Sequence, residues 1–188
     1  MRNTCSILLL AFTAMLLAAC GNNDSNITVV KGSAKEMITD PLLIEIHSLE
    51  KKTKEDTVFD RNTGLRLLQA YQTYYNQHGK DSLALHYLFE GGRVASALGK
   101  YQKAIDMFIT YHDLINDEEK KAEAAYLVAF SYDAHLNDSE KAIEYYNKVI
   151  ERYPRSKWAE QSKAALHLVG KSDEELIKFL QERNKVNS

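Results

Sequence analysis

Cys20 is the residue whose position most directly suggests chemistry. It follows an N-terminal segment that starts with the positive Arg2, continues with an apolar run at residues 7–17 and ends in two alanines. The chain turns polar at once over residues 21–26. A positive start, an apolar centre and small residues at the exit are typical of a cleaved secretory signal. Cleavage at this point would place the Cys20 thiol at the new amino terminus.

The run Leu17-Ala18-Ala19-Cys20 resembles a bacterial lipobox. The resemblance implies that residues 1–19 are a lipoprotein signal peptide and that Cys20 receives acyl chains, which together hold a protein on a membrane. One alternative is an ordinary signal with a fortuitous cysteine. The other is a retained membrane-spanning helix, for which the apolar run is short. Cys5 would leave with the signal, so no disulfide framework is expected.

The composition of the remaining chain is nearly balanced in charge. Removing residues 1–19 removes only the charge of Arg2, which leaves 23 basic and 26 acidic residues, a net charge of about −3. No basic block suggests a nucleic acid partner. The length fits one domain. Two prolines and eight glycines are few for this length, which favours long helices.

No group of side chains has the spacing of a known catalytic or metal site. The sequence lacks a His-Glu-x-x-His zinc motif, a Gly-x-Ser-x-Gly nucleophile motif and a phosphate-binding glycine loop. Its six histidines are never three or four residues apart, so a zinc site would need convergence from distant positions. We therefore expect no enzyme activity, no metal and no cofactor. The histidines are 47, 78, 86, 112, 135 and 167.

The elements that position the remaining side chains are predicted to be helices throughout. Asp40 and Pro41 form a favoured helix start after a polar tether at residues 20–39. From about residue 62, apolar residues recur at helical spacing with regular interruptions. Ser172 and Glu175 predict a capping box. The predicted helices cover residues 40–54, 63–77, 82–98, 101–115, 119–136, 139–152, 156–169 and 173–185.

One pattern occurs twice and more faintly a third time. Lys-Ala-Ile is followed by an aromatic residue four positions after the alanine, at Ala104 with Phe108 and again at Ala142 with Tyr146. The two alanines are 38 residues apart, and Leu67 takes the equivalent place 37 residues before Ala104. This period lies in the range of helical-hairpin repeats. Small alanines would let neighbouring helices approach, and the aromatic rings would fill the space between hairpins.

The pattern resembles the tetratricopeptide repeat, whose period is 34 residues. Ala142, Tyr146 and Pro154 match the family, whereas Val149 replaces a small residue. In the earlier copy Gly92 stands at the first-helix glycine position, which Phe130 takes in the later copy. The longer period and the phrase at 152–160 are similar to outer-membrane lipoproteins of the BamD and CpoB kind. The resemblance covers about residues 60–186.

The resemblance implies an all-α stack of helical hairpins. We expect the hairpins 63–77/82–98, 101–115/119–136 and 139–152/156–169 to stack, because one pair cannot bury both apolar faces. Tyr71 and Tyr146 are predicted to be core residues. The predicted domains are a signal peptide at 1–19, a lipidated cysteine and tether at 20–39, an N-terminal helix and loop at 40–62, and the repeat domain at 63–188.

In this family the first helix of each pair lines a concave groove, which implies a protein or peptide partner. Arg93 beside Phe89 would hold a carboxylate next to an apolar side chain. The alternatives are a merely solvated groove and a convex ridge that bears Tyr75, Tyr145 and Trp158. Carried over by position, the groove residues are His86, Phe89, Arg93, Ser96, Leu127, Ser131 and His135.

Together these features predict a non-enzymatic, lipid-anchored scaffold for proteins of the bacterial envelope, as in outer-membrane assembly or cell-wall coordination. The process is taken from analogy, because fold does not establish function. Gly21 favours the outer membrane over inner-membrane retention, with the domain facing the periplasm. A surface-exposed ligand-binding lipoprotein and an accessory subunit of an envelope enzyme stay open as alternatives.

Overall fold

The computed structural model describes residues 40–55, 58–79 and 81–172, with 174, 175, 177, 178 and 181 beyond them. The chain divides into two units, Met1–Ser33 and Ala34–Ser188, and every described residue belongs to the second. The predicted signal peptide, the Cys20 site, the tether at 20–39 and most of the helix at 173–185 lie outside the described residues.

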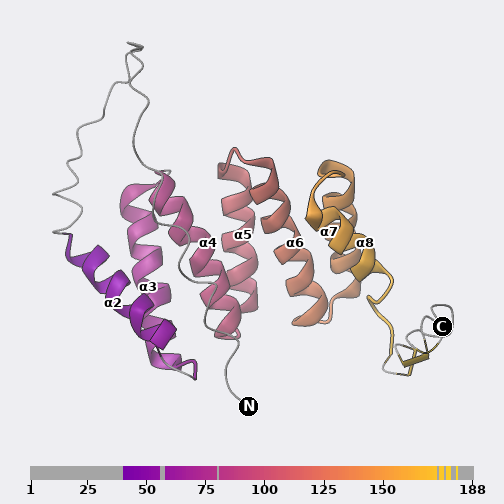
Figure 1. The fold of residues 1–188 in the computed structure, drawn as a ribbon, viewed down its shortest axis with the longest axis horizontal. Helices are drawn as coiled ribbons and strands as arrows, with labels where there is room; N and C mark the ends of the chain where they lie inside the picture. The colour runs from indigo at the N-terminus through magenta and orange to yellow at the C-terminus, as the bar shows by residue number, and fades with distance from the viewer. Residues whose placement is uncertain are drawn as a thin grey trace, which may run out of the picture. The chain divides into compact units, whose positions relative to one another are not determined.

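The described part of the chain is all-helical and contains no strand. Consecutive helices pack against one another along the chain, and α8 also contacts α6 (Figure 1). This confirms the predicted all-α stack of hairpins. None of these helices has the length and apolar content needed to cross a membrane. The helices are α2 (Pro41–Glu55), α3 (Arg61–His78), α4 (Ser82–Ala97), α5 (Tyr101–Leu114), α6 (Glu118–Ala134), α7 (Ser139–Arg152) and α8 (Lys157–Leu166).

Short polar side chains fix where the helices begin. A side-chain oxygen just before each helix except α5 accepts a hydrogen bond from a backbone N–H of the first turn. Such caps satisfy N–H groups that have no partner within the helix. α3 begins two residues before its predicted start, because Asp60 accepts from two first-turn amides. The capping residues are Asp40, Asp60, Asp81, Asp117, Asp138 and Ser156.

α8 ends three residues before the prediction, at Leu166, and turns follow it. The predicted capping box beyond it is confirmed. The Ser172 backbone N–H donates to Glu175 Oε2 at 2.8 Å, and the Glu175 N–H donates to Ser172 Oγ at 3.3 Å. The side chain of each residue thus accepts a hydrogen bond from the backbone N–H of the other.

The repeated alanines and aromatic residues lie at the contacts between helices. Ala104 and Ala142 have 0% of their surface exposed, and Phe108 and Tyr146 have 2% and 0%. All four belong to one apolar cluster that extends across α3 to α7. The prediction of tight helix contacts at the two alanines is confirmed. Large side chains at these positions would separate the helices.

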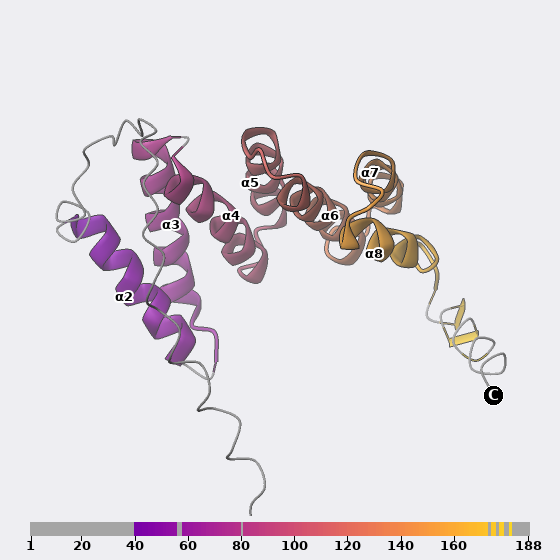
Figure 2. The same cartoon turned by 45° about the horizontal axis from the view of Figure 1, so that its top comes forward.

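A second cluster joins α2 to α3 and α4. Leu43, Ile46 and Leu49 of α2 are buried against Tyr71 and its neighbours. The predicted burial of Tyr71 is confirmed, and its hydroxyl donates to Glu50 Oε1 at 2.8 Å. Burial, followed by this bond to Glu50, raises the pKa of Tyr71. α2 therefore continues the helical packing on the N-terminal side of α3 (Figure 2).

Candidate partner-binding groove

An open groove of about 700 Å³ lies between α4 and the region where α5 leads into α6. Six residues of α4 line it, and three of them, His86, Phe89 and Arg93, lie three and four residues apart on one face. The opposite wall comes from the last turn of α5, the loop after it and the first turns of α6. Among the lining residues are His86, Phe89, Arg93, Tyr111, Leu114, Ile115, Lys120 and Glu123.

Phe89 forms the apolar wall of the groove. Its ring centroid lies 4.8 Å from that of Tyr111 and 5.6 Å from that of Phe108, both on α5. Phe89 is half-buried, so one part of the ring holds the two helices together and the rest faces the groove. Aromatic rings at this spacing attract each other beyond their simple burial. Packing between α4 and α5 therefore positions this wall in the free protein.

Charged residues of both signs line the groove. Arg93 Nη1 lies 3.4 Å from Glu90 Oε1, and the Arg93 side chain stays 62% exposed. Lys120 is exposed, and Glu123 belongs to the same lining. Burial, followed by the carboxylates of Glu123 and Asp117, raises the pKa of Tyr111. The groove thus offers two exposed cations beside an apolar wall.

The structure brings together three of the seven predicted groove residues, namely His86, Phe89 and Arg93. Ser131 does not face solvent, because it is 2% exposed and its hydroxyl donates to the Leu127 carbonyl at 2.7 Å. Leu127 is half-buried and packs against the main apolar cluster. Ser96 is half-buried too and lies outside the lining of this groove.

His135 lies at the end of α6, where it packs against other aromatic rings. Its ring stacks on that of Tyr101 at 4.2 Å with an interplanar angle of 10°. The Phe130 ring meets it edge-on at 5.5 Å. His135 therefore belongs to a cluster at the turn between α6 and α7 and not to the groove beside α4.

Sequence reasoning missed the wall opposite α4. Leu114 ends α5 and Ile115 follows it, and the family's first-helix rule does not include these positions; Lys120 lies in the first turn of α6, before the residues taken from that helix. The available signal was Asn116-Asp117, which marks the turn that brings both helix ends to this place. Because of this turn, the side chains on either side of it could have been named as candidate groove residues.

The alternative ridge residues do not share one surface element, since Tyr75, Tyr145 and Trp158 lie on α3, α7 and α8. Tyr145 stacks on Tyr132 at 5.6 Å. Trp158 is half-buried against Tyr126, with ring centroids 5.1 Å apart. Tyr145 and Trp158 are therefore partly buried by contacts within the fold, which leaves less of their surface for a partner.

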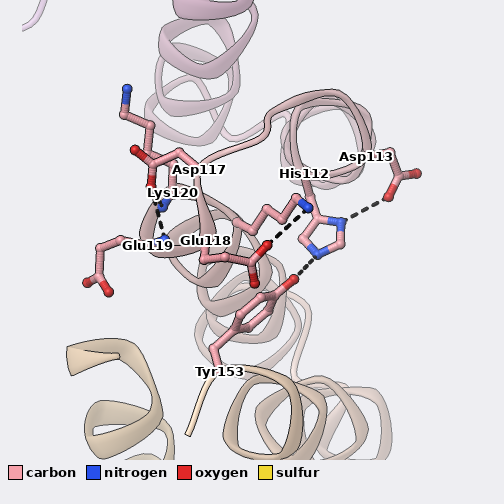
Figure 3. Close-up of polar contacts among 8 residues, drawn as sticks. His112, Asp113, Asp117, Glu118, Glu119, Lys120 and Tyr153 are labelled. Carbon is pink, nitrogen blue, oxygen red and sulfur yellow. Dashed lines mark hydrogen bonds and ion pairs between the residues drawn. The ribbon is translucent and has the colours of Figure 1, made fainter. Parts of the chain in front are cut away.

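A smaller pocket of about 160 Å³ lies between α5, α6 and α7 and contains a histidine with two polar partners (Figure 3). His112 Nδ1 lies 2.9 Å from Asp113 Oδ1, and His112 Nε2 lies 2.7 Å from the Tyr153 hydroxyl. A carboxylate only accepts, so Nδ1 carries a proton toward Asp113, and the second ring nitrogen shares a hydrogen bond with the Tyr153 hydroxyl.

The Asp113–His112–Tyr153 chain has the order of a catalytic triad but a poor nucleophile at its end. Burial, followed by the Glu118 carboxylate, raises the pKa of Tyr153 and so disfavours the phenolate. A raised pKa makes the loss of the phenol proton harder, which is the opposite of the lowered pKa that activates many nucleophiles. The contact instead ties the end of α5 to the end of α7. Within the described residues no three His, Cys, Asp or Glu side chains are grouped to hold a metal.

The comparison with protein families identifies one repeat within this geometry. A tetratricopeptide repeat family model matches residues 123–156. The matched segment spans most of α6 and all of α7, from Glu123 to the turn after Tyr153. No curated protein matches the chain. Proteins built on this repeat are typically non-catalytic scaffolds for protein–protein interactions, and no enzyme family is indicated.

The match corrects the predicted pairing of the helices. We predicted that 101–115 pairs with 119–136 and that 139–152 pairs with 156–169, whereas the repeat joins α6 to α7. In the same register α4 pairs with α5, which agrees with Gly92 of α4 lying against Phe108 of α5. The groove beside α4 thus lies where one repeat meets the next. The error arose because successive helices are joined by turns of similar length.

Proposed function

We propose that this chain is a lipid-anchored tetratricopeptide scaffold that binds a protein partner in the groove beside α4. The observation that carries the proposal is the exposed Arg93 next to the fixed ring of Phe89, in a groove without a nucleophile and base in contact. The setting is the bacterial envelope, with Cys20 acylated at the outer membrane and the domain in the periplasm. This role resembles that of lipoproteins of the BamD and CpoB kind.

The groove chemistry suits a peptide segment that carries an acidic group and an apolar side chain. An arginine guanidinium offers several donors to a carboxylate, and Lys120 adds a second positive charge on the opposite wall. Phe89 and Leu114 offer apolar surface beside these charges. The Glu90 carboxylate pairs with Arg93 in the free protein and holds the guanidinium at the groove. A partner carboxylate would share that cation or displace Glu90.

Capture from detergent-solubilised envelope tests the groove with the variant Phe89→Ala plus Arg93→Ala. Truncating anchor residues at an interface typically costs about 2 kcal/mol or more, roughly a thirtyfold loss of affinity. We expect the helical circular dichroism to be preserved and one partner, identified by mass spectrometry, to be lost.

The matched control is Ile44→Ala plus Arg66→Ala. It also removes an exposed apolar residue and an arginine that forms an ion pair, here with Glu45 at 2.8 Å. The control should retain the partner. A groove variant that keeps every partner, while the variant Tyr75→Ala plus Tyr145→Ala loses one, would move the binding site to the ridge.

A further inference from the structure

The described helices alternate in direction, so their connections fall on two opposite edges. One edge, which we call the hairpin edge, holds the end of α2, the start of α3, the turns α4–α5 and α6–α7, and the end of α8 (Figure 1). Contacts join these parts: Arg61 Nη1 donates to the Leu98 carbonyl at 3.3 Å, and Tyr101 stacks on His135 at 4.2 Å. A Cβ on Gly170 would lie 3.4 Å from Ser139 Oγ, which places the chain after α8 at the start of α7.

Exposed apolar side chains are concentrated on the hairpin edge. Nine large apolar side chains are exposed among the described residues, and seven of them lie there. The exceptions are Ile44, at the start of α2 on the opposite edge, and Ile177, beyond α8. Single exposed apolar residues are normal on a protein surface. Seven of nine on one edge form a grouping, and grouped exposed apolar residues often mark an interaction surface. The seven are Val58, Phe59, Leu65, Phe130, Leu136, Ile143 and Leu168.

The arrangement of these side chains differs from that of a groove for a peptide. They stand at the ends of helices and in turns, and none of them lines a pocket among those found on the described residues. The edge also carries aromatic rings, since Tyr101, His135 and Phe130 follow one another in contact. Lys100, in the α4–α5 turn, and Lys171, after α8, are exposed on the same edge. Apolar, aromatic and lysine side chains together are typical of surfaces that rest in a lipid interface.

The length of chain before the described residues allows this contact. Asp40 lies twenty positions after Cys20, and an extended chain spans about 3.5 Å per position, or roughly 70 Å. α2 is 15 residues long and so runs about 23 Å from Asp40 to the hairpin edge. A lipid anchor at Cys20 would therefore reach the membrane with the hairpin edge turned toward it, although α2 itself begins at the opposite edge.

We propose that the hairpin edge rests on the phospholipid surface and inserts Val58, Leu136 and Leu168 among the headgroups. This inference rests on the proposed membrane anchoring and adds an orientation to it. The helices then stand on the bilayer, and the α5–α6 connection that lines the groove lies at the edge away from it. Contact with lipid at several points would hold the groove at a fixed height above the membrane.

Fluorescent labelling in vesicles tests the orientation. The full chain is produced with Cys5→Ser, reconstituted into vesicles of zwitterionic and anionic phospholipid, and labelled at Leu136→Cys, Leu168→Cys or the matched control Ile44→Cys. Interfacial side chains sit about 5–10 Å into the headgroup region, within reach of a nitroxide-labelled lipid. We expect a blue shift and nitroxide quenching at positions 136 and 168, and neither at position 44.

The outcomes separate this inference from the anchoring on which it rests. The Cys5→Ser parent keeps Cys20 as its one cysteine. If this parent is labelled, the Cys20 thiol is free, and if it fails to float with vesicles, the protein is not anchored; either result shows that the Cys20 anchor is wrong. If the protein floats but positions 136 and 168 are quenched no more than position 44, the orientation is wrong. A third outcome is a blue shift that is present without lipid, in detergent, and that nitroxide-labelled lipid does not quench. It would mean that another protein chain covers the edge, and it would also overturn the proposal.

Discussion

The ring of Phe108 occupies the space that a side chain on Gly92 would need. A Cβ built on Gly92 would lie 2.6 Å from Phe108 Cε1, well inside ordinary van der Waals contact. The two residues belong to α4 and α5, the pair that forms one repeat in the register of the family match. Their contact shows why the earlier copy of the pattern has glycine at this position.

Gly92→Ala is therefore expected to destabilise the protein, although alanine favours helices by about 1 kcal/mol over glycine. Overpacking a well-packed core typically costs about 1–3 kcal/mol, which exceeds that gain. Chemical denaturation measures the loss. In the background Phe108→Leu the same substitution should be neutral or stabilising, because the smaller side chain leaves room. An equal loss in both backgrounds would show that the ring is not the obstacle.

Ala142→Leu should lower the free energy of unfolding by about 1–3 kcal/mol. Ala142 is fully buried where α7 meets its neighbours, and Tyr146 one turn later is fully buried as well. Asn147→Leu adds the same side chain at an exposed position of the same helix and should change stability by less than about 0.5 kcal/mol. Equal thermal midpoints for the two variants would argue against the tight helix contact.

Alkaline pH should weaken the fold through its buried tyrosines. Burial, followed by the Glu50 carboxylate, raises the pKa of Tyr87 from 10.0 to about 12. The unfolded chain loses this proton first, so the stabilisation is complete below pH 10 and declines as the pH rises through 10 to 12. At pH 11 the loss from Tyr87 alone is about 1.4 kcal/mol.

Denaturation of the wild type and of Tyr87→Phe at pH 9 and pH 11 checks this expectation. The variant should lose less stability between the two pH values than the wild type does. Its remaining loss should come from Tyr71 and Tyr146, whose pKa values burial also raises. Identical pH dependence in the two proteins would mean that Tyr87 ionises as freely in the fold as in the unfolded chain.

Acylation of Cys20 is expected from the Leu17-Ala18-Ala19-Cys20 motif. Mass spectrometry of the mature N-terminus should show a cysteine that carries acyl chains, and Cys20→Ala should release the protein from the membrane fraction. Cys5→Ala is the matched control, because it removes the other cysteine and should leave fractionation unchanged. An unacylated wild type that starts at another residue would exclude this anchor.

The sequence by itself determined the helices and their closest contacts. Apolar residues at helical spacing and a capping aspartate before most helices locate the elements to within a few residues, because both signals are local. Ala104 and Ala142 could be predicted as contact positions because the same phrase occurs twice. The Cys20 anchor is also a purely local motif and stays a prediction.

Only the tertiary structure decided which side chains form a surface. Ser131 and Arg93 hold equivalent places in their repeats, yet Ser131 is buried because α6 packs against α5, α7 and α8. Lys120 and Arg93 line the same groove, because the turn from α5 to α6 places the start of α6 beside α4. Exposure depends on neighbours that are distant in the chain, and no periodicity within one helix contains that information.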